Sequence, residues 1–512
     1  MSGIDLLLYN GKIYTMDSQN TLVNWVIIKD GIIVETGCGE GYGQYIEDAV
    51  EAIDLKGLVV LPGFFDNHVH LAQTGLNLMS LDLNHVEDLN QLLETISCAA
   101  SKTGKGEIIR GIGFDEMRTP EKRMPNRREL DKCSPNNPVW INRVEYHISS
   151  VNTMLLSMLN LPFNLEGILR DEKGLPDGRL IGRANLFVRK YIIENIPNQV
   201  KKEAINKAIE QAICRGITTV NSMEGGNFFN ESGMKCILEN NSIFPIDVKL
   251  YYQTTDIRKA LEKGIRCIGG DLFLDGSFGS RTAALSEPYE DEILTNGVLY
   301  YTQEEVDDFV QQAHEQGLHI ALHAIGERAI DQALDAYEKA QRYSLRKDAR
   351  HRIEHFELAT DAQIKRAKAL NIIPSMQPAF EFMWGGAGKM YETRLGNRYK
   401  RTNRFNKMVQ EGLCIAGGSD SDVTEMNPIL GIHSAVNHPV EENRIDVLEA
   451  IKMFTCNGAY AGFEEGKKGS IQLDKKGDLV ILDQDPFSIP KEDIKNIKVM
   501  GTIKEGNILL IR

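Results

Sequence analysis

Two histidines stand one residue apart in the stretch Pro62-Gly-Phe-Phe-Asp-Asn-His-Val-His-Leu71. The run before them is short, apolar and punctuated by glycine and proline, which is typical of a buried strand rather than a helix. Side chains at positions i and i+2 of a strand point to the same side, so His68 and His70 can direct both imidazoles at one point. Alone, the pair is as consistent with two ordinary polar residues at a strand end as with two metal ligands.

Three more residues of ligand type close short apolar runs further along the chain. His323 ends the run LHIALH, His355 ends RHRIEH, and Asp420 follows LCIAGGS. A single histidine in such a place is more often structural, but five residues in one pattern indicate a metal site. Imidazole and carboxylate are the usual ligands of a catalytic Zn²⁺ or similar divalent ion, with one position left open for water.

The middle of the chain has the texture of a parallel βα barrel, because short apolar runs alternate there with helical patterns. Eight runs are predicted to be strands: 58–68, 217–223, 247–253, 268–275, 318–323, 351–356, 371–376 and 413–420. Helices are predicted between most of them, for example at 200–215, 302–316, 361–370 and 405–411. In a (β/α)8 barrel the active-site residues stand at the carboxyl ends of the strands, where the five ligand-type residues fall.

The two ends of the chain differ from the middle, because both alternate β-like runs with turns. The tripeptides YNG and KDG near the N-terminus are hairpin signals. We therefore predict an α/β protein with a distorted (β/α)8 TIM barrel over 61–455 and a small β-sandwich built from 1–60 and 456–512. The gap after the first barrel strand is too long for a loop, so about 72–198 is predicted to be an inserted cap subdomain.

The composition limits which kinds of partner and which location are expected for the protein. The 512 residues carry 58 Lys and Arg against 72 Asp and Glu, a net charge of −14, which argues against a nucleic-acid or anionic-membrane partner. The eight cysteines form no C-x-x-C pair, so we expect reduced, mostly buried thiols. No secretory signal and no apolar stretch of membrane-spanning length is found, which predicts a cytoplasmic protein. A homodimer is expected only from the general frequency of two-fold symmetry.

Six motifs, spread from residue 62 to residue 486, resemble the amidohydrolase superfamily and, within it, the third amidohydrolase family, that of the N-substituted formamide deformylase-like hydrolases. They are PGFFDNHVH, DGSFGSRTAAL, LHAIGERAID, RHRIEHFE, AGGSDSDV and GSIQLDKKGDLVILDQDP. The resemblance runs in order from about residue 5 to the end of the chain. It implies a metal-dependent hydrolase of carbon–nitrogen bonds, with His68, His70, His323 and His355 as ligands. It also implies that Asp420 binds metal and shuttles the proton.

One position departs from the pattern. Proteins of this kind often carry, four residues before the Asp-Gly of the fourth strand, a lysine that bridges two metals once it is carboxylated. Here Asp271 stands in that place, on a shorter arm that reaches the centre only if the backbone or the metals lie further inward. Three readings follow. In the first, one metal is bound by His68, His70, His323 and Asp420, and His355 contacts the substrate or the bound water. In the second, Asp271 bridges two metals, and in the third, Glu224 supplies the carboxylate instead. For Asp271 and Glu224 an ordinary structural or loop role is also open.

The expected reaction is hydrolysis of a non-peptide C–N bond of a small molecule, an amide, formamide or related group. A metal-activated water would attack, Asp420 would move the proton, and His355 would steady the oxyanion. Zinc is the expected ion, although Fe, Mn, Co or Ni suit the same ligands. Other expected substrate contacts are His147 and Asn152, each as consistent with a structural role, Arg281, as consistent with a local salt bridge, and Trp384, in a Gly-rich loop after the seventh strand. A C–O or P–O hydrolase and a non-catalytic binding barrel remain as alternatives.

Overall fold

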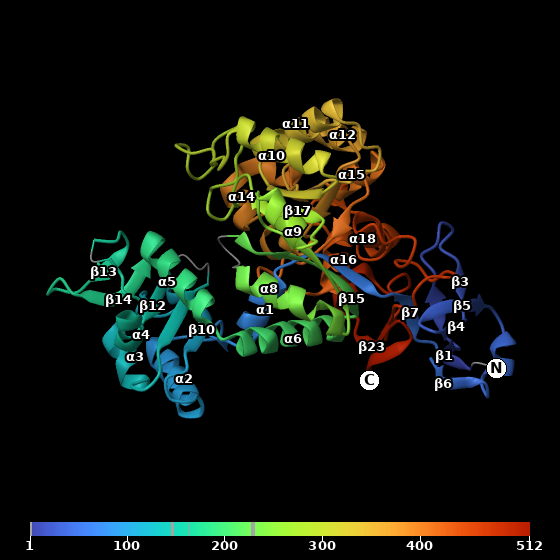
Figure 1. Ribbon diagram of the computed structural model, residues 1–512, viewed down its shortest axis with the longest axis horizontal. Coiled ribbons are helices and arrows are strands. Elements are labelled where there is room, and N and C mark those ends of the chain that lie inside the picture. The colour runs from blue at the N-terminus through green and yellow to red at the C-terminus, as the bar shows by residue number, and fades with distance from the viewer. Residues whose placement is uncertain (1–2, 145–147, 163, 227–230) are drawn as a thin grey trace. The chain divides into compact units, whose positions relative to one another are not determined.

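The computed structural model describes residues 3–144, 148–162, 164–226 and 231–512 (Figure 1). The chain divides into two compact units, Met1–Leu71 with Ala208–Arg512, and Ala72–Lys207. Among the described residues, no helix is both long and apolar enough to cross a membrane.

The first unit contains the predicted barrel. Its eight parallel strands lie in chain order in one sheet: β8 (Phe64–Val69), β15 (Ile217–Glu224), β16 (Asp247–Tyr252), β17 (Cys267–Phe273), β18 (His319–Ala324), β19 (Arg352–His355), β20 (Ile373–Met376) and β21 (Ala416–Gly417). A parallel bridge between Val69 and Ser421 brings the last strand back to the first. The barrel prediction is confirmed.

Helices follow the strands. Those of the barrel include α8 (Glu231–Asn240), α9 (Ile257–Glu262), α10 (Gln303–Glu315), α11 (Glu327–Tyr343), α12 (Asp361–Ala369), α13 (Ala379–Trp384), α14 (Met390–Leu395), α15 (Phe405–Gln410), α16 (Pro428–Val436), α17 (Val447–Met453) and α18 (Cys456–Ala461). Capping boxes begin α10 and α12, because Thr302 and Thr360 each exchange hydrogen bonds with the residue three positions on.

Both ends of the chain contribute to a β-sandwich. One sheet has the order β5-β4-β1-β6 and the other β24-β23-β22-β7-β2-β3. Their strands are β1 (Ile4–Tyr9), β2 (Lys12–Tyr14), β3 (Leu22–Val23), β4 (Trp25–Lys29), β5 (Ile32–Gly37), β6 (Ala49–Asp54), β7 (Val59–Pro62), β22 (Leu479–Leu482), β23 (Val499–Lys504) and β24 (Asn507–Ile511). Leu6, Leu8 and Ile28 of the first sheet share a buried cluster with Val60 and Ile481 of the second. The predicted sandwich of both termini is therefore confirmed.

Three details of the sequence interpretation are wrong. The run 58–68 is two strands: β7 lies in the sandwich and β8 in the barrel, and Gly63 separates them. YNG does not close a hairpin, since β1 pairs with β4 and β6 while β2 pairs with β3 and β7. KDG does, between β4 and β5. Among the described residues the cysteines form no disulfide, but most are not buried: Cys236 and Cys267 are the two that are.

The second unit, residues 72–207, interrupts the barrel between β8 and β15. Its six-stranded sheet has the order β13-β14-β12-β11-β10-β9. The elements are α1 (Leu71–Leu78), β9 (Leu81–Asp82), α2 (Leu89–Lys102), β10 (Ile109–Phe114), α3 (Arg127–Cys133), β11 (Val139–Arg143), β12 (Ile148–Val151), α4 (Thr153–Met158), β13 (Ile168–Arg170), β14 (Pro176–Ile181), α5 (Gly182–Asn195) and α6 (Asn198–Cys214).

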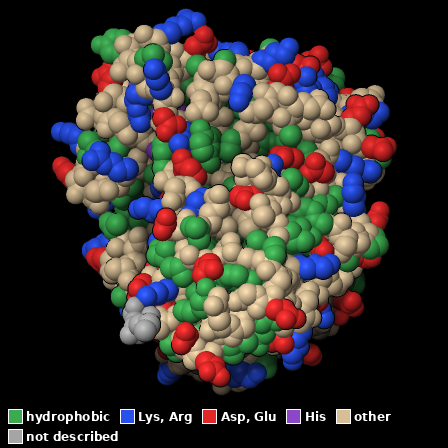
Figure 2. All heavy atoms as spheres, turned by 90° about the vertical axis from the view of Figure 1, so that its right-hand side faces the viewer, with side chains coloured by type: hydrophobic (Ala, Val, Ile, Leu, Met, Phe, Trp, Pro, Cys, Tyr) green, Lys and Arg blue, Asp and Glu red, His purple; other side chains and the backbone are tan. Residues whose placement is uncertain are grey.

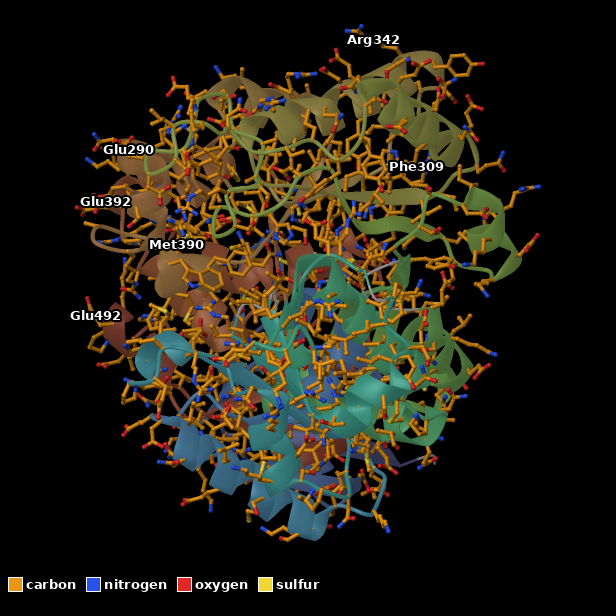
Figure 3. The ribbon with its side chains drawn as sticks, turned by 90° about the vertical axis from the view of Figure 1, so that its left-hand side faces the viewer. Glu290, Phe309, Arg342, Met390, Glu392 and Glu492 are labelled. Carbon is orange, nitrogen blue, oxygen red and sulfur yellow. The ribbon has the colours of Figure 1, made fainter. Side chains whose placement is uncertain are left out.

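The long segment between β17 and α10 folds back against α14. The Glu290 N–H donates to the Arg394 carbonyl at 2.9 Å, and Figure 3 shows Glu290 beside Met390 and Glu392 of α14. On the face seen in Figure 2, acidic and basic side chains are interspersed with apolar ones.

Candidate metal centre

The carboxyl ends of the barrel strands bring six of the sequence-predicted side chains together inside the barrel. None has more than 7 % of its surface exposed: His68, His70, Asp271, His323, His355 and Asp420. Asp271, His355 and Asp420 have φ angles of 70°, 72° and 54°. Non-glycine residues held in this costly conformation cluster at active sites and ligand clamps.

Two sets of three side chains place their ligand atoms close enough for one ion: His68, His70 and Asp420, and His68, Asp271 and His355. Asp420 Oδ1 lies 3.3 Å from His68 Nε2 and 3.2 Å from His70 Nε2. Two ligands of a tetrahedral Zn²⁺ are about 3.3 Å apart, given bonds of roughly 2.0–2.1 Å. In the second set, Asp271 Oδ1 lies 3.4 Å from His355 Nε2 and 3.9 Å from His68 Nε2.

The donors fit a divalent cation. Within the described part of the chain, His68 Nε2 and Asp271 Oδ1 are buried without a hydrogen-bond partner. A buried polar atom left unpaired is costly, and an ion satisfies both atoms at once. Three imidazoles and two carboxylates form the nitrogen and oxygen donor set that catalytic Zn²⁺ and related ions take.

Each imidazole is held at Nδ1 by an acceptor, which directs Nε2 to the centre. His68 Nδ1 lies 2.6 Å from Glu354 Oε2, His70 Nδ1 lies 3.0 Å from the Met223 carbonyl, and His355 Nδ1 lies 2.7 Å from Gln377 Oε1. This is the arrangement that fixes ring orientation and tautomer in metal-binding histidines. Composition and spacing do not identify these partners. The one signal in the sequence is that Arg352 and Glu354 are unusual charges for a buried strand.

Glu354 is itself held by Arg352. The guanidinium donates to both Glu354 oxygens at 2.7 and 2.8 Å, and both residues are fully buried. Arg352 also donates to the Asn67 carbonyl on β8 and to Ser375 Oγ on β20. Burial would raise the pKa of Glu354, but Arg352 and His68 hold it at about 2. The pair therefore keeps a charged carboxylate behind His68.

Charge balance at the centre favours a cation. Burial alone would lower the pKa of His68, yet the carboxylates of Asp271, Asp420 and Glu354 raise it well above its usual value. Burial would likewise raise the pKa of Asp420, but His68 and His70 hold it below its usual range. Both shifts express the attraction that the carboxylates exert on positive charge.

Asp420 is positioned from β8. Its N–H donates to the His68 carbonyl at 2.8 Å. Asp66 accepts from the N–H of Ser419 at 2.9 Å and from its hydroxyl at 2.5 Å. Burial raises the pKa of Asp66 to about 6. The segment 64–70, which consists of β8 and the residue after it and carries two candidate ligands, thus also fixes the turn that carries a third.

His323 and Glu224 belong to neither set of three. His323 Nδ1 lies 3.2 Å from Asp275 Oδ1, and its ring centre is 4.4 Å from that of His355. Asp275 accepts from three backbone N–H groups, those of Ala284, Ile325 and Gly326. Glu224, at the end of β15, is buried and accepts from the Ser222 hydroxyl at 2.8 Å.

The four predicted substrate contacts differ in their surroundings. His147 lies outside the described residues. Asn152 caps α4 and uses its amide within the insert, accepting from Val139 and Leu155 and donating to the Ser134 and Asn137 carbonyls. These contacts correspond to the structural alternative for Asn152.

Arg281 and Trp384 lie in the barrel unit. Arg281 pairs with Asp291 through two hydrogen bonds of 3.1 and 2.9 Å, which is the local salt bridge considered for it. Trp384 ends α13 rather than lying in a loop. Its ring centre is 5.0 Å from that of Phe380, which stacks on His355 at 6.1 Å. The Phe380 ring is thus next to both Trp384 and the candidate ligand His355.

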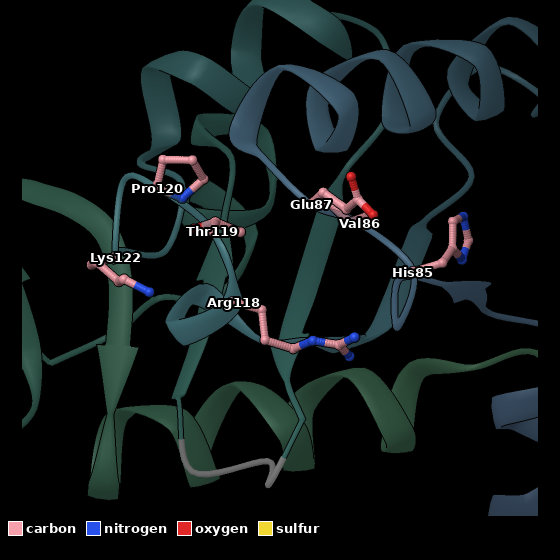
Figure 4. Close-up of a pocket in the computed structure, with 7 residues that line it drawn as sticks. All are labelled: His85, Val86, Glu87, Arg118, Thr119, Pro120 and Lys122. Carbon is pink, nitrogen blue, oxygen red and sulfur yellow. The ribbon is translucent and has the colours of Figure 1, made fainter.

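A separate hollow of about 700 Å³ lies within the insert, between the segments that follow β9 and β10. Figure 4 shows Lys122 on one side of it and Glu87 and His85 on the other, with the Arg118 side chain extending towards the His85 segment. Arg118 donates to the Asn84 carbonyl at 3.1 Å. None of the six residues of the candidate metal centre lines it.

Barrel, sandwich and buried histidine–carboxylate centre together define a hydrolase of the metal-dependent barrel class. The chain belongs to the amidohydrolase family, whose model matches residues 51–510. That family places the protein among hydrolases that act on carbon–nitrogen bonds.

Similar proteins support this assignment over the whole chain. An Arthrobacter pascens N-substituted formamide deformylase is 27% identical, over 98% of this chain and 97% of its own. A Bacillus subtilis protein named as an amidohydrolase, YtcJ, is 28% identical over 98% of both chains. The crystal structure of an uncharacterized metal-dependent hydrolase from Pyrococcus furiosus superposes with a TM-score of 0.81 and 31% identity, over 94% of this chain and all of that one.

Proposed function

We propose that the protein hydrolyses a non-peptide C–N bond of a small molecule, an amide, formamide or related group, with a divalent ion held at the barrel centre. The observation that carries the proposal is the convergence of His68, His70 and Asp420, with ligand-atom separations of 3.2 and 3.3 Å. The similarity to a formamide deformylase supports the choice of bond. Zinc is the proposed ion, because it suits nitrogen and oxygen ligands at tetrahedral spacing.

We propose one ion rather than two. In both sets the nitrogen of His68 that faces the carboxylate is Nε2, which has a single lone pair, and His68 Nδ1 is already bonded to Glu354. The two sets therefore describe one centre and cannot each fill a site through His68. His68, His70 and Asp420 would hold the ion, with Asp271 as a further carboxylate in reach.

A bound divalent ion supplies positive charge that lowers the pKa of a coordinated water and polarises the substrate carbonyl. Asp420 would accept the proton of the attacking water and deliver it to the leaving nitrogen. His355, with its Nδ1–H directed at Gln377, carries a lone pair at Nε2 when neutral. It can donate to the oxyanion only as an imidazolium, so its neutral form suits a ligand.

The test is elemental analysis of protein purified without chelator, followed by a substrate panel. The proposal expects close to one ion per chain and hydrolysis of an amide or formamide ahead of a lactone or a phosphotriester. Preference for the lactone or phosphotriester would support the C–O or P–O alternative. Absence of metal after reconstitution with Zn²⁺, Mn²⁺ or Co²⁺ would contradict the proposal and support a binding barrel.

A further inference from the structure

Strand β17 carries a bulge beside the candidate metal centre. Ile268 pairs with Ile320 of β18, and the next pair is Leu272 with Leu322. Three residues, 269–271, thus lie opposite the single residue Ala321. On the other side, pairing with β16 ends at Ile268. Such bulges bend a strand and redirect a side chain, and they are enriched next to active sites.

Glycine is required at two positions of the bulge. Gly269 and Gly270 have φ angles of 84° and 48°. A Cβ at Gly269 would lie 2.2 Å from the Ala321 carbonyl oxygen, and one at Gly270 would lie 2.5 Å from the Tyr251 carbonyl oxygen. Both obstacles are backbone atoms of the neighbouring strands, so neither can turn aside.

The bulge ends at Asp271, whose φ is 70°. The Gln253 side chain donates to the Asp271 carbonyl at 2.7 Å, on the side where ladder pairing with β16 has stopped. The carboxylate faces the three imidazoles: Asp271 Oδ1 is 3.4 Å from His355 Nε2 and Oδ2 is 3.7 Å from His70 Nε2. The short side chain reaches the centre from this bulged backbone.

We infer that Gly269, Gly270 and Gln253 are positioning residues, which hold the backbone of β17 where the Asp271 carboxylate can bind the ion. The inference rests on the proposed metal centre. It adds that Asp271 is a ligand and that its reach depends on the bulge, so side-chain length and backbone geometry at this position are matched.

The experiment deletes Gly269 and Gly270 together. This leaves Asp271 alone opposite Ala321 and keeps the two-residue alternation of the strand. Zn²⁺ affinity of the metal-stripped protein, measured by competition with a chelator, should fall by about tenfold or more, the cost typical of disturbing a ligand's support. Asp271→Glu in the shortened strand should recover most of it, because its arm is one methylene longer. Asp271→Glu with the bulge intact should weaken binding.

Gly264→Ala is the matched control. Gly264 precedes the same strand and has a φ of 71°, and a Cβ added there would meet no atom within 4 Å. The substitution imposes a similar backbone strain without blocking a neighbour, so Zn²⁺ affinity should stay at the wild-type value. Circular dichroism of each metal-stripped variant checks that it has folded.

Gln253→Met provides a second variant if the shortened chain does not fold. Removing its hydrogen bond to the Asp271 carbonyl should weaken Zn²⁺ binding in the wild type but not in an Asp271→Ala background. Equal weakening in both backgrounds, or Asp271→Ala with wild-type affinity, would overturn the inference while leaving the metal centre in place. A wild-type protein that binds no metal would instead contradict the proposed function.

Discussion

His68 Nδ1 lies 2.6 Å from Glu354 Oε2, and neither side chain is exposed. Glu354 lies on β19 and His68 on β8, two strands that are not neighbours in the order of the barrel sheet. The contact joins residues separated by 286 positions in the chain. It gives His68 a charged partner, whereas His70 and His355 are held by a backbone carbonyl and a neutral amide.

Glu354→Gln tests this contact. The substitution keeps the shape and removes the charge, so Zn²⁺ affinity should fall by roughly 10- to 100-fold. Chelator competition on the stripped protein measures the change. Gln377→Glu is the reciprocal variant, which gives His355 a charged partner. If Glu354→Gln binds Zn²⁺ as tightly as wild type, His68 does not depend on that charge.

Arg352→Met should be more damaging to the fold than to the chemistry. Arg352 and Glu354 form a fully buried ion pair, and removing one partner leaves an unpaired buried charge. Breaking such a pair typically costs about 3–5 kcal/mol of the free energy of unfolding. Urea unfolding of the metal-stripped protein measures it. The double variant Arg352→Met, Glu354→Gln should recover part of the loss, because no isolated charge remains.

Asp420→Asn should remove turnover and leave the fold. The amide keeps the size of the side chain but has no basic oxygen to accept the water proton, so kcat should fall by roughly 10²- to 10⁴-fold. The measurement is kcat on the best substrate of the panel, with metal content determined on the same sample. Turnover near the wild-type value in a metal-loaded variant would exclude the proton-shuttle role.

The positions of the strands and of the candidate ligands can be predicted from the sequence, because buried parallel strands are short apolar runs and ligands stand where those runs stop. His68, His70, His355 and Asp420 follow from this rule. The hydrogen-bond partners that hold the ligands cannot be predicted in this way, since Glu354 meets His68 only after the barrel closes. Arg352 and Glu354, two positions apart in a buried strand, are the one local sign of that pair.

Two other features depend on backbone geometry that the spacing of apolar residues in the sequence does not reveal. The apolar run 58–68 continues without a polar break while the chain leaves the sandwich and enters the barrel, so the pattern predicts one strand where two exist. The bulge at 269–271 changes the register of β17 without changing its composition. From the sequence, Asp271 therefore looks too short for the centre, although the bulged backbone places its oxygens 3.4 to 3.9 Å from three imidazoles.

His355→Gln separates two roles for this residue. If His355 is a ligand, as its Nδ1–H bond to Gln377 favours, Zn²⁺ affinity should fall together with kcat. If it steadies the oxyanion instead, affinity should stay and kcat should fall, since the lost interaction exists only in the transition state. Zn²⁺ affinity and kcat measured on one preparation distinguish the two. A variant unchanged in both would remove His355 from the site.

Three further buried histidines lie outside the candidate centre, and from them we expect the free energy of unfolding to depend on pH. The Ile320 N–H donates to His351 Nδ1 at 3.2 Å, so the His351 proton is on Nε2, which donates to His314 Nδ1 at 2.8 Å. His314 Nε2 then donates to the Ser344 carbonyl at 2.7 Å. Every ring nitrogen of His314 and His351 is used by the neutral form, and a further proton would break a bond.

Burial lowers the pKa of His351 well below its usual value, and the nearby His314 and Arg346 lower it further. Burial likewise lowers the pKa of the third histidine, His319, with Lys249 and Arg352 adding to the effect. The unfolded chain therefore binds more protons than the folded one below about pH 6.5. The free energy of unfolding that these histidines contribute is fully present above that pH. It should be lost on acidification, by about 1.4 kcal/mol per pH unit for each histidine that stays neutral in the folded protein.

His351→Gln should flatten this dependence, because the amide does not titrate. The measurement is the free energy of unfolding in urea between pH 7.5 and 5.5, on metal-stripped wild type and variant, so that loss of metal does not contribute. The variant is expected to be less stable at pH 7.5 and to lose less on acidification. His85→Gln, at an exposed position of the insert, is the matched control and should follow the wild-type slope. Parallel slopes for wild type and His351→Gln would mean that His351 takes up a proton in the folded protein as readily as in the unfolded chain.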